Sequence, residues 1–178
     1  DPDFGDNYYY SRGIMSRFAY HYLDWTRPFV DQVDFFWSLI RDDIGEIAPC
    51  LDYEEWDGAP SPGTARQQYR DACGRLQWLL QSAGWDTVNR RQQTYTAPGY
   101  WASFGSADSY WMLNTDLFIA HWYAINPTVP RPWLSYTLWQ YSVKGDGIAA
   151  GCESKQIDCD RLNPSVPFNV WSLPLPGA

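Results

Sequence analysis

The sequence has few basic residues and no long apolar run, and each of these shortages excludes a class of protein. Lys and Arg together number 13, against 21 Asp and Glu, which gives a formal net charge of −8. A nucleic-acid-binding domain needs a basic surface to neutralise phosphates, so we expect no nucleic-acid partner. No apolar segment approaches the roughly 18 residues of a membrane-spanning helix, so we expect no membrane span.

Metal-binding patterns are missing as well. The chain has 2 His and 4 Cys, and it has no CxxC pair of the kind that zinc sites use. Asp158 and Asp160 form an Asp-Cys-Asp segment, which lacks the glycine and the bidentate glutamate of an EF-hand calcium loop. We therefore expect neither a metal nor a cofactor.

The four cysteines leave the disulfide state open, because four cysteines allow three pairings. Cys152 and Cys159 flank a short polar segment, so a bridge across a hairpin is one option. Cys50 and Cys73 belong to a predicted strand and to the helix that follows it, so they could also meet. Four reduced thiols, which behave as small hydrophobic side chains, are the alternative.

Aromatic side chains are what the sequence has in excess: Tyr 13, Trp 11 and Phe 8, or 18% of all residues. Large aromatic rings serve where one side of a contact is apolar and the other is wet. Sugar-binding clefts are such places, because aromatic faces stack on the apolar faces of pyranose rings. The composition therefore favours a carbohydrate ligand, with an aromatic-rich core as the alternative.

Hydrophobic periodicity predicts short strands that alternate with helices. The predicted strands are 18–25, 46–55, 92–97, 116–122, 136–142 and 156–162, and the predicted helices are 28–44 and 64–82, with single helical turns at 98–104 and 107–113. Thr64 and Gln67 form a capping box at the start of the second helix. Strands that alternate with helices are typical of a mostly parallel sheet or barrel. The last strands lack helices between them, which predicts a more antiparallel finish.

The segment 51–54 is the strongest candidate for chemistry. Side chains alternate across a strand, so Asp52 and Glu54 share one face and Tyr53 lies on the other. Two carboxylates about 6–7 Å apart on one face repel each other. One of them is then easily held protonated, as the general acid of glycoside cleavage must be. A solvated acidic turn at the end of a strand is the alternative.

Two further features are weaker indications. Asp158 and Asp160 repeat the same spacing on the last predicted strand. His21 alternates with the tyrosines on either side of it, and a histidine in such a strand is more often a structural residue than a catalyst.

These segments, in this order and spacing over residues 3–163, resemble the family 25 glycoside hydrolases, the Ch-type lysozymes that cleave peptidoglycan after N-acetylmuramic acid. The segments that carry the resemblance are Ala19-Tyr20-His21-Tyr22, Asp31-Gln32-Val33-Asp34-Phe35-Phe36, Leu51-Asp52-Tyr53-Glu54, Tyr95-Thr96 with Tyr100-Trp101, Leu138-Trp139-Gln140-Tyr141-Ser142, and Gly147-Ile148 leading to Ile157-Asp158.

The resemblance implies an α/β fold, an irregular TIM-like (β/α)5(β)3 barrel with its pocket at the carboxyl ends of the strands. It implies that Glu54 is the general acid that protonates the glycosidic oxygen, and that Asp52 holds charge and orients either Glu54 or the N-acetyl group of the substrate. Asp158 corresponds to the family's carboxylate on the last strand. The candidates for sugar stacking or for shaping the cleft are the aromatic residues Tyr20, Tyr53, Tyr95, Trp101 and Trp139.

The resemblance also implies that the barrel is incomplete at its N-terminus. The family begins with two strands, the first with another active-site aspartate, and this chain starts after them, at a segment that includes Asp3, Phe4 and Asn7. The sequence is then either a fragment of a longer protein or a domain that has lost these strands. We expect a catalytic barrel over 1–163 and a proline-rich strap or linker over 164–178.

The activity expected from the resemblance is hydrolysis of peptidoglycan glycan strands at the β-1,4 bond between N-acetylmuramic acid and N-acetylglucosamine. Such an enzyme would be secreted, or carried on a virion, to act on the cell wall, with a further wall-binding domain or a larger assembly as partner. The alternative is a catalytically inactive barrel that serves as a structural or wall-binding part of such an assembly.

Overall fold

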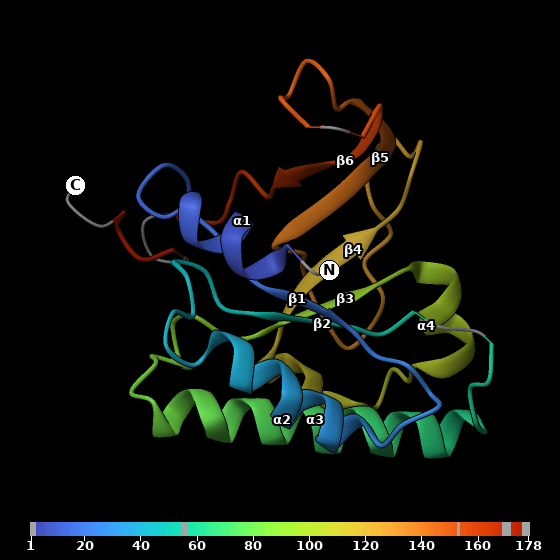
Figure 1. The fold of residues 1–178 in the computed structure, drawn as a ribbon. Helices are drawn as coiled ribbons and strands as arrows, with labels where there is room; N and C mark the ends of the chain where they lie inside the picture. Colours follow the sequence, from blue (N-terminus) through green and yellow to red (C-terminus); the bar gives the residue numbers. More distant parts are fainter. Residues whose placement is uncertain (1–2, 55–56, 153, 169–171, 176–178) are drawn as a thin grey trace.

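The centre of the structure, a computed structural model, is a curled sheet that forms an open half-barrel (Figure 1). Among residues 3–54, 57–152, 154–168 and 172–175, which the structure describes, this sheet has six strands in the order of the chain. The strands are β1 (Tyr20–Tyr22), β2 (Cys50–Asp52), β3 (Gln93–Thr96), β4 (Asp116–Ala120), β5 (Leu138–Asp146) and β6 (Gln156–Leu162). β1 to β5 pair in parallel, and β6 is antiparallel to β5.

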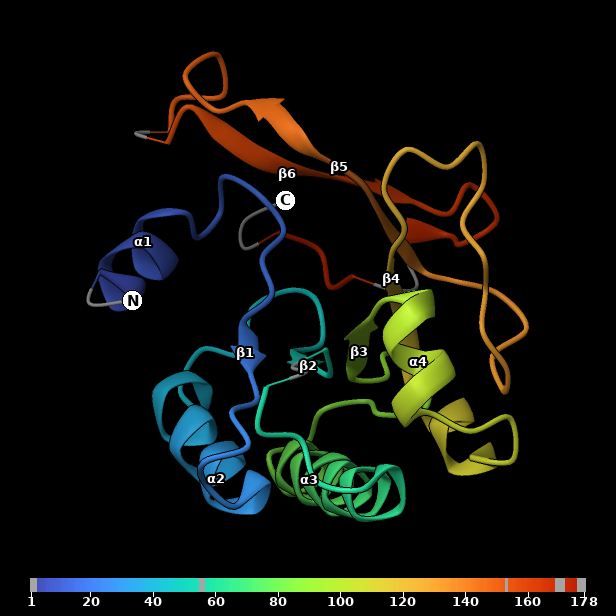
Figure 2. The same ribbon diagram turned by 90° about the vertical axis from the view of Figure 1, so that its right-hand side faces the viewer.

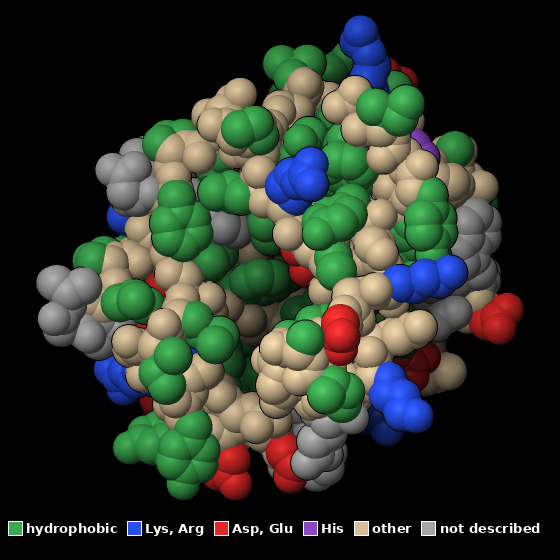
Figure 3. Space-filling view, turned by 90° about the horizontal axis from the view of Figure 1, so that it is seen from above, with side chains coloured by type: hydrophobic (Ala, Val, Ile, Leu, Met, Phe, Trp, Pro, Cys, Tyr) green, Lys and Arg blue, Asp and Glu red, His purple; other side chains and the backbone are tan. Residues whose placement is uncertain are grey.

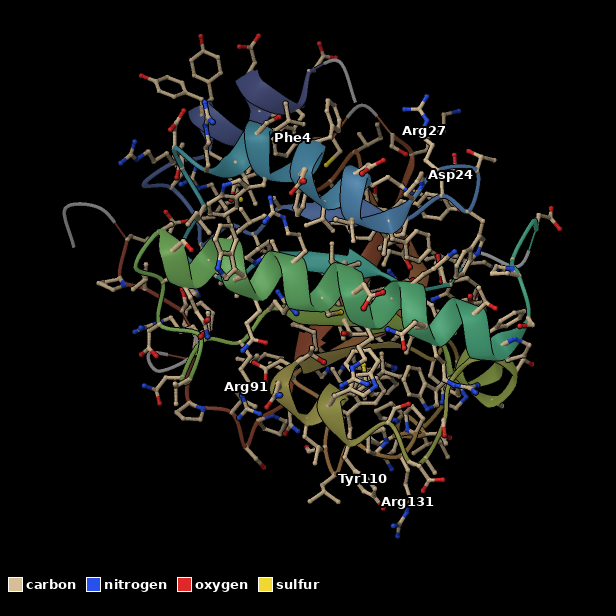
Figure 4. All side chains as sticks on the ribbon, turned by 90° about the horizontal axis from the view of Figure 1, so that it is seen from below. Phe4, Asp24, Arg27, Arg91, Tyr110 and Arg131 are labelled. Atoms are coloured by element: carbon tan, nitrogen blue, oxygen red, sulfur yellow. The ribbon has the colours of Figure 1, made fainter. Side chains whose placement is uncertain are left out.

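All the helices except the first cover the outer face of this sheet. The helices are α1 (Phe4–Tyr10), α2 (Phe29–Ile40), α3 (Pro62–Ser82) and α4 (Pro98–Phe104), with a 3-10 helix, η1, at Tyr110–Asn114. Right-handed crossovers between successive parallel strands place the connecting helices on one face. α2 and α3 accordingly lie side by side across the underside of the molecule (Figure 4). α1 lies on the other side of the sheet, above β1 (Figure 2).

The alternation of side chains along the strands builds one apolar cluster on each face of the sheet. The larger cluster faces the helices and includes Leu51, Leu117 and Ile119 from the strands with Val33, Phe36, Tyr69 and Leu76 from α2 and α3. The smaller one, on the inner face, consists of Ile47, Cys50, Tyr95, Phe118, Ala120 and Leu138. The inner face therefore carries less apolar packing and has room for polar side chains.

The order and type of the predicted strands agree with the structure, but the element ends differ. β1 and β2 have three residues each, and Glu55, at the end of the predicted strand 46–55, lies outside the described residues. The antiparallel finish is confirmed for β6 only. β5 still pairs in parallel with β4, because the connection 121–137 crosses back over the sheet without forming a helix. α1 had no counterpart among the predicted elements.

The capping-box prediction for α3 was wrong. The helix begins at Pro62, and Ser61 is its N-cap: the Ser61 side chain accepts a hydrogen bond from the backbone N–H of Thr64 at 3.4 Å. The side chain of Gln67 instead donates to Asp71, one turn further along the helix, at 2.9 Å. Proline suits the first helical position, since its missing N–H would be unpaired there anyway.

A buried ion-pair network fastens α1 to the sheet. The Arg17 guanidinium donates to both carboxylate oxygens of Glu46, from Nε at 3.0 Å and from Nη2 at 2.9 Å, and it also pairs with Asp43 at 3.0 Å. The Tyr8 carbonyl of α1 accepts from Arg17 Nη1 at 2.6 Å, and the Tyr8 ring lies against the guanidinium. The backbone N–H of Leu173 donates to the Glu46 carbonyl at 2.7 Å, so part of segment 164–178 packs against the same network.

All four cysteines are free thiols in the structure. Cys50 and Cys73 are buried, Cys159 is half-buried and Cys152 is exposed. Neither of the two bridges that the sequence left open is formed. In the part of the chain that the structure describes, none of the helices combines the length and the apolar character that a membrane crossing requires.

Candidate active site

A cavity of about 350 Å³ lies on the inner face of the half-barrel. Successive strands supply its walls: Tyr20 from β1, Glu54 just after β2, Tyr95 from β3 and Trp122 just after β4. The other lining residues are Phe18, Phe118, Gln140, Val143, Asp158 and Asp160. Figure 3, which looks down on the side of the sheet away from α2 and α3, shows a hollow with hydrophobic side chains around it and acidic groups beside it. The position of Glu54 and Trp122 after their strands is where barrel enzymes hold their active sites.

Asp52 does not line this cavity; it is buried beneath Tyr20, which does, and is only 1% exposed. The Tyr20 hydroxyl donates a hydrogen bond to Asp52 Oδ2, whereas the buried Oδ1 has no partner among the described residues. Burial, followed by the charge of Glu54, raises the pKa of Asp52 to about 8, although the Tyr20 hydrogen bond acts in the opposite direction. Burial also raises the pKa of Tyr20, so the phenol keeps its proton. The raised pKa favours the neutral, protonated form of Asp52.

Glu54 is half-buried in the cavity wall. Burial, and then the charge of Asp158, raises the pKa of Glu54 above its usual value. The same two causes raise the pKa of Asp160 to about 6. A carboxyl group that keeps its proton close to neutral pH is what acid catalysis of glycoside cleavage requires.

Gln140 lies between two aromatic side chains of the cavity wall. Its Oε1 accepts a hydrogen bond from the Tyr95 hydroxyl at 2.9 Å and another from Trp122 Nε1 at 2.8 Å. An indole N–H can only donate, so the atom of Gln140 beside Trp122 must be the oxygen. This contact fixes the orientation of the side-chain amide.

A second cavity, of about 340 Å³, adjoins the first. It is lined by residues 97–99 at the start of α4 and by 120–123 at the end of β4, together with Glu54. Glu54 and Trp122 line both cavities. A chain-like ligand that occupied both would therefore pass the Glu54 carboxyl group.

The aromatic residues that the sequence singled out fall into two groups. Tyr20 and Tyr95 line the first cavity. Tyr53, Trp101 and Trp139 belong to the helix-facing cluster, each is 5% exposed or less, and each donates through its polar atom to a backbone carbonyl. The alternation along the strands explains this for Tyr53 and Trp139, which are neighbours of the inward-facing Asp52 and Gln140.

Sequence reasoning did not single out Gln140 or Trp122 as site residues, and it noted Asp160 only as the partner of Asp158 in a second acidic pair. Trp122 ends a predicted strand, and Gln140 shares a face with Leu138 on the next one, so the strand pattern contained a signal for both. His21 lies on the helix side of β1, where its ring stacks on Phe36 with centroids 5.1 Å apart and burial lowers its pKa. Among the described residues there is no group of three or more His, Cys, Asp or Glu that could hold a metal ion.

A parallel half-barrel with protonatable carboxyl groups and aromatic walls at its strand ends defines a class of protein: glycoside hydrolases, which work with pairs of Asp or Glu residues beside the scissile bond. Comparison with models of protein families shows which family of glycoside hydrolases the chain matches. The model for glycosyl hydrolases family 25 matches residues 1–148 of the 178 residues. The chain belongs to this family. No curated protein sequence gives a match.

Solved structures share the fold. The chain is similar to a bacterial lysozyme from Streptomyces coelicolor, with 23% identity and a TM-score of 0.73 over 96% of this chain and 78% of the lysozyme. A muramidase from Trichobolus zukalii has 21% identity and a TM-score of 0.72, over 93% and 77% of the two chains. The spore cortex lytic enzyme SleM from Clostridium perfringens has 22% identity and a TM-score of 0.70, over 93% of this chain and 55% of SleM. The half-barrel is thus the TIM-like distorted barrel of these enzymes.

Proposed function

We propose that this chain hydrolyses peptidoglycan at the β-1,4 bond between N-acetylmuramic acid and N-acetylglucosamine, and that it acts on the cell wall from outside the cell or from a virion. The observation that carries the proposal is Glu54, a half-buried carboxyl group with a raised pKa that lines both cavities of the family barrel. The names of the similar proteins (lysozyme, muramidase and spore cortex lytic enzyme) support the substrate class.

Glu54 is the general acid of this mechanism. Burial and the charge of Asp158 raise its pKa and so favour its protonated form, and its place between the two cavities brings the carboxyl group to a bond that joins one sugar in each. Protonation of the glycosidic oxygen makes the departing sugar a better leaving group.

Asp52 is an orienting residue. Tyr20 holds its Oδ2, and its buried Oδ1 has no partner among the described residues. In the proposed mechanism this fixed carboxyl group orients either Glu54 or the N-acetyl group of the substrate once the glycan is bound.

Asp158 supplies negative charge on the opposite wall, from β6. Its charge is one of the causes of the raised pKa of Glu54 and of Asp160, so it acts across the cavity. Glycoside cleavage passes through an oxocarbenium-like transition state, which such a charge stabilises.

Some of the aromatic residues contact the glycan in the proposed complex, and others support the walls of the cavity. Tyr20 and Tyr95 offer their rings to the sugar in the first cavity, and Trp122 stands at the boundary of the second. Tyr53, Trp101 and Trp139 support the walls from the helix-facing side, where they shape the cleft without reaching it.

The test is loss of turbidity in purified bacterial cell walls, with the soluble products identified by mass. We expect products with N-acetylmuramic acid at the reducing end, both from this chain and from a version extended upstream. Products from the extended version alone would show that this chain needs further segments for activity. Wall binding without products from either version would refute the proposal and establish the inactive wall-binding barrel.

A further inference from the structure

Gln140 lines the same cavity as Glu54 but takes no part in the proton transfer. Its side-chain oxygen accepts hydrogen bonds from Tyr95 and Trp122, one for each of its two lone pairs. This oxygen is saturated, and the donor-only indole of Trp122 prevents the amide from turning over. The group that remains is the NH2 of Gln140, with two donor hydrogens.

The NH2 group of Gln140 is free to bind a ligand. It makes no hydrogen bond to a described residue, and it is not among the buried polar atoms that lack a partner, so it is accessible. Gln140 as a whole is only 5% exposed and lines the cavity, so the accessible part faces the cavity. The structure shows no side-chain hydrogen bond between Gln140 and Asp160, its partner across the β5–β6 register.

We propose that Gln140 is a specificity-determining residue whose NH2 group donates a hydrogen bond to the acetamido carbonyl oxygen of the sugar bound in the first cavity. This inference rests on the proposed function, because it takes an N-acetylated sugar as the ligand. An amide carbonyl is the strongest neutral acceptor on such a sugar. A sugar with a free amine would instead set an ammonium group, which has only donors, against the fixed donors of Gln140.

The physical consequence is discrimination between N-acetylated and de-N-acetylated glycans. A site built around a fixed donor is penalised when the ligand leaves that donor unpaired. Hydrogen bonds from Tyr95 and Trp122 hold the amide before the ligand arrives, so the donor is already in place when the sugar binds.

The experiment compares kcat/KM on purified cell walls with kcat/KM on the same walls after removal of their N-acetyl groups. We expect the unmodified chain to prefer the N-acetylated walls. Gln140→Met should lower kcat/KM on these by about 10-fold, the equivalent of one hydrogen bond, and should change the rate on the deacetylated walls much less.

Gln140→Glu is a second variant, with a side chain of the same shape, for which the inference predicts a reversed preference and not merely a loss of activity. The carboxylate has the same shape and still accepts from Tyr95 and Trp122, but it offers an acceptor in place of the donor. Its preference should therefore shift toward the deacetylated walls, whose ammonium groups it can bind. The matched control is Gln68→Glu on the exposed face of α3, which adds the same charge away from the cavity and should keep the original preference.

A binding measurement separates this inference from the proposed function. Calorimetric titration of the Glu54→Gln variant with a β-1,4 tetramer of N-acetylglucosamine should give a Kd that rises about 10-fold when Gln140→Met is added. If the unmodified chain cleaves walls but Gln140→Met keeps both its preference and this Kd, the inference is wrong and the function stands. If the unmodified chain neither cleaves walls nor binds the tetramer, both are wrong.

Discussion

Asp52 and Glu54 stand on one face of the chain but differ in access to a ligand. Asp52 is buried, with a pKa of about 8, and is hydrogen-bonded to Tyr20. Glu54 is half-buried and lines both cavities. A general acid must come within hydrogen-bond reach of the glycosidic oxygen. We therefore assign this role to Glu54, which lines the cavities, although the pKa of the buried Asp52 is raised as well.

Replacing Glu54 by glutamine should abolish turnover and leave sugar binding intact. The amide keeps the shape of the side chain but has no transferable proton, so we expect kcat on cell walls to fall by at least about 100-fold with little change in affinity. Turbidity assays measure the first quantity, and calorimetry with an N-acetylglucosamine tetramer measures the second. Asp108→Asn, an exposed change outside the cavities, is the control. A Glu54→Gln variant that kept most of its rate would refute the acid assignment.

At the scale of elements, α3 shows how a local contact sets a helix boundary. The helix has 21 residues and packs against α2 and the sheet, so its start is important for the helix-facing cluster. The residue that caps it is Ser61, and Pro62 follows at the first helical position.

Ser61→Ala should lower the free energy of unfolding by about 1 kcal/mol, the usual cost of losing an N-cap side chain. Urea denaturation followed by circular dichroism measures this change. Ser61→Asp keeps an acceptor at the cap and should leave the stability nearly unchanged. Gln67→Ala should also have little effect; a larger loss from Gln67→Ala than from Ser61→Ala would restore the capping box that the sequence predicted.

The ion-pair network around Arg17 leads to a second prediction about how the elements are held together. Arg17→Met leaves the carboxylate of Glu46 buried without its cation, and breaking a buried pair in this way costs about 3–5 kcal/mol. Burial alone would raise the pKa of Glu46, but the hydrogen bonds from Arg17 hold it below its usual value, so the carboxylate stays charged. Arg17→Met combined with Glu46→Gln should be less destabilised than the sum of the two single changes. Additive losses in urea denaturation would contradict this coupling.

At the scale of the whole molecule, the buried acid of the site links stability to pH. Asp52 has a pKa of about 8 in the folded chain and 3.8 when unfolded. Between these values the folded chain holds a proton that the unfolded chain has lost. The stabilisation from Asp52 is therefore complete below pH 3.8 and is lost as the pH rises toward 8. His21 has a lowered pKa, so its effect on stability lies mainly below its unfolded value of 6.5 and, just above that pH, it opposes the effect of Asp52 only slightly.

From pH 6.5 to pH 8 the free energy of unfolding should fall by about 1–2 kcal/mol, since one proton held only by the folded chain corresponds to about 1.4 kcal/mol per pH unit. Asp52→Asn removes that proton and should flatten the dependence, whereas Asp108→Asn should leave it unchanged. Urea denaturation at a series of pH values tests this. An equal slope in Asp52→Asn and in the unmodified chain would show that Asp52 is not the group responsible.

The order and type of most elements could be predicted from the amino-acid sequence, because a strand or helix repeats its apolar side chains with a local period. The same alternation put Asp52 and Glu54 on one face and Tyr53 on the other. Features that depend on distant segments could not be read in this way. The raised pKa of Asp52 needs the burial that the neighbouring strands β1 and β3 provide, against which the hydrogen bond from Tyr20 acts. The orientation of Gln140 needs Tyr95 from β3 and Trp122, which follows β4.

Which aromatic side chains reach the cavity depends on how the distant elements pack together. Trp101 lies in α4 and packs into the helix-facing cluster, and Trp139 points to the same side of the sheet, whereas Tyr20 and Tyr95 line the cavity on the inner face. The position of α1 also depends on a distant contact. None of its residues is buried, and Arg17, which lies outside the helix, anchors it to the sheet. Local periodicity encodes elements, whereas burial and charge at a site arise only when distant elements come together.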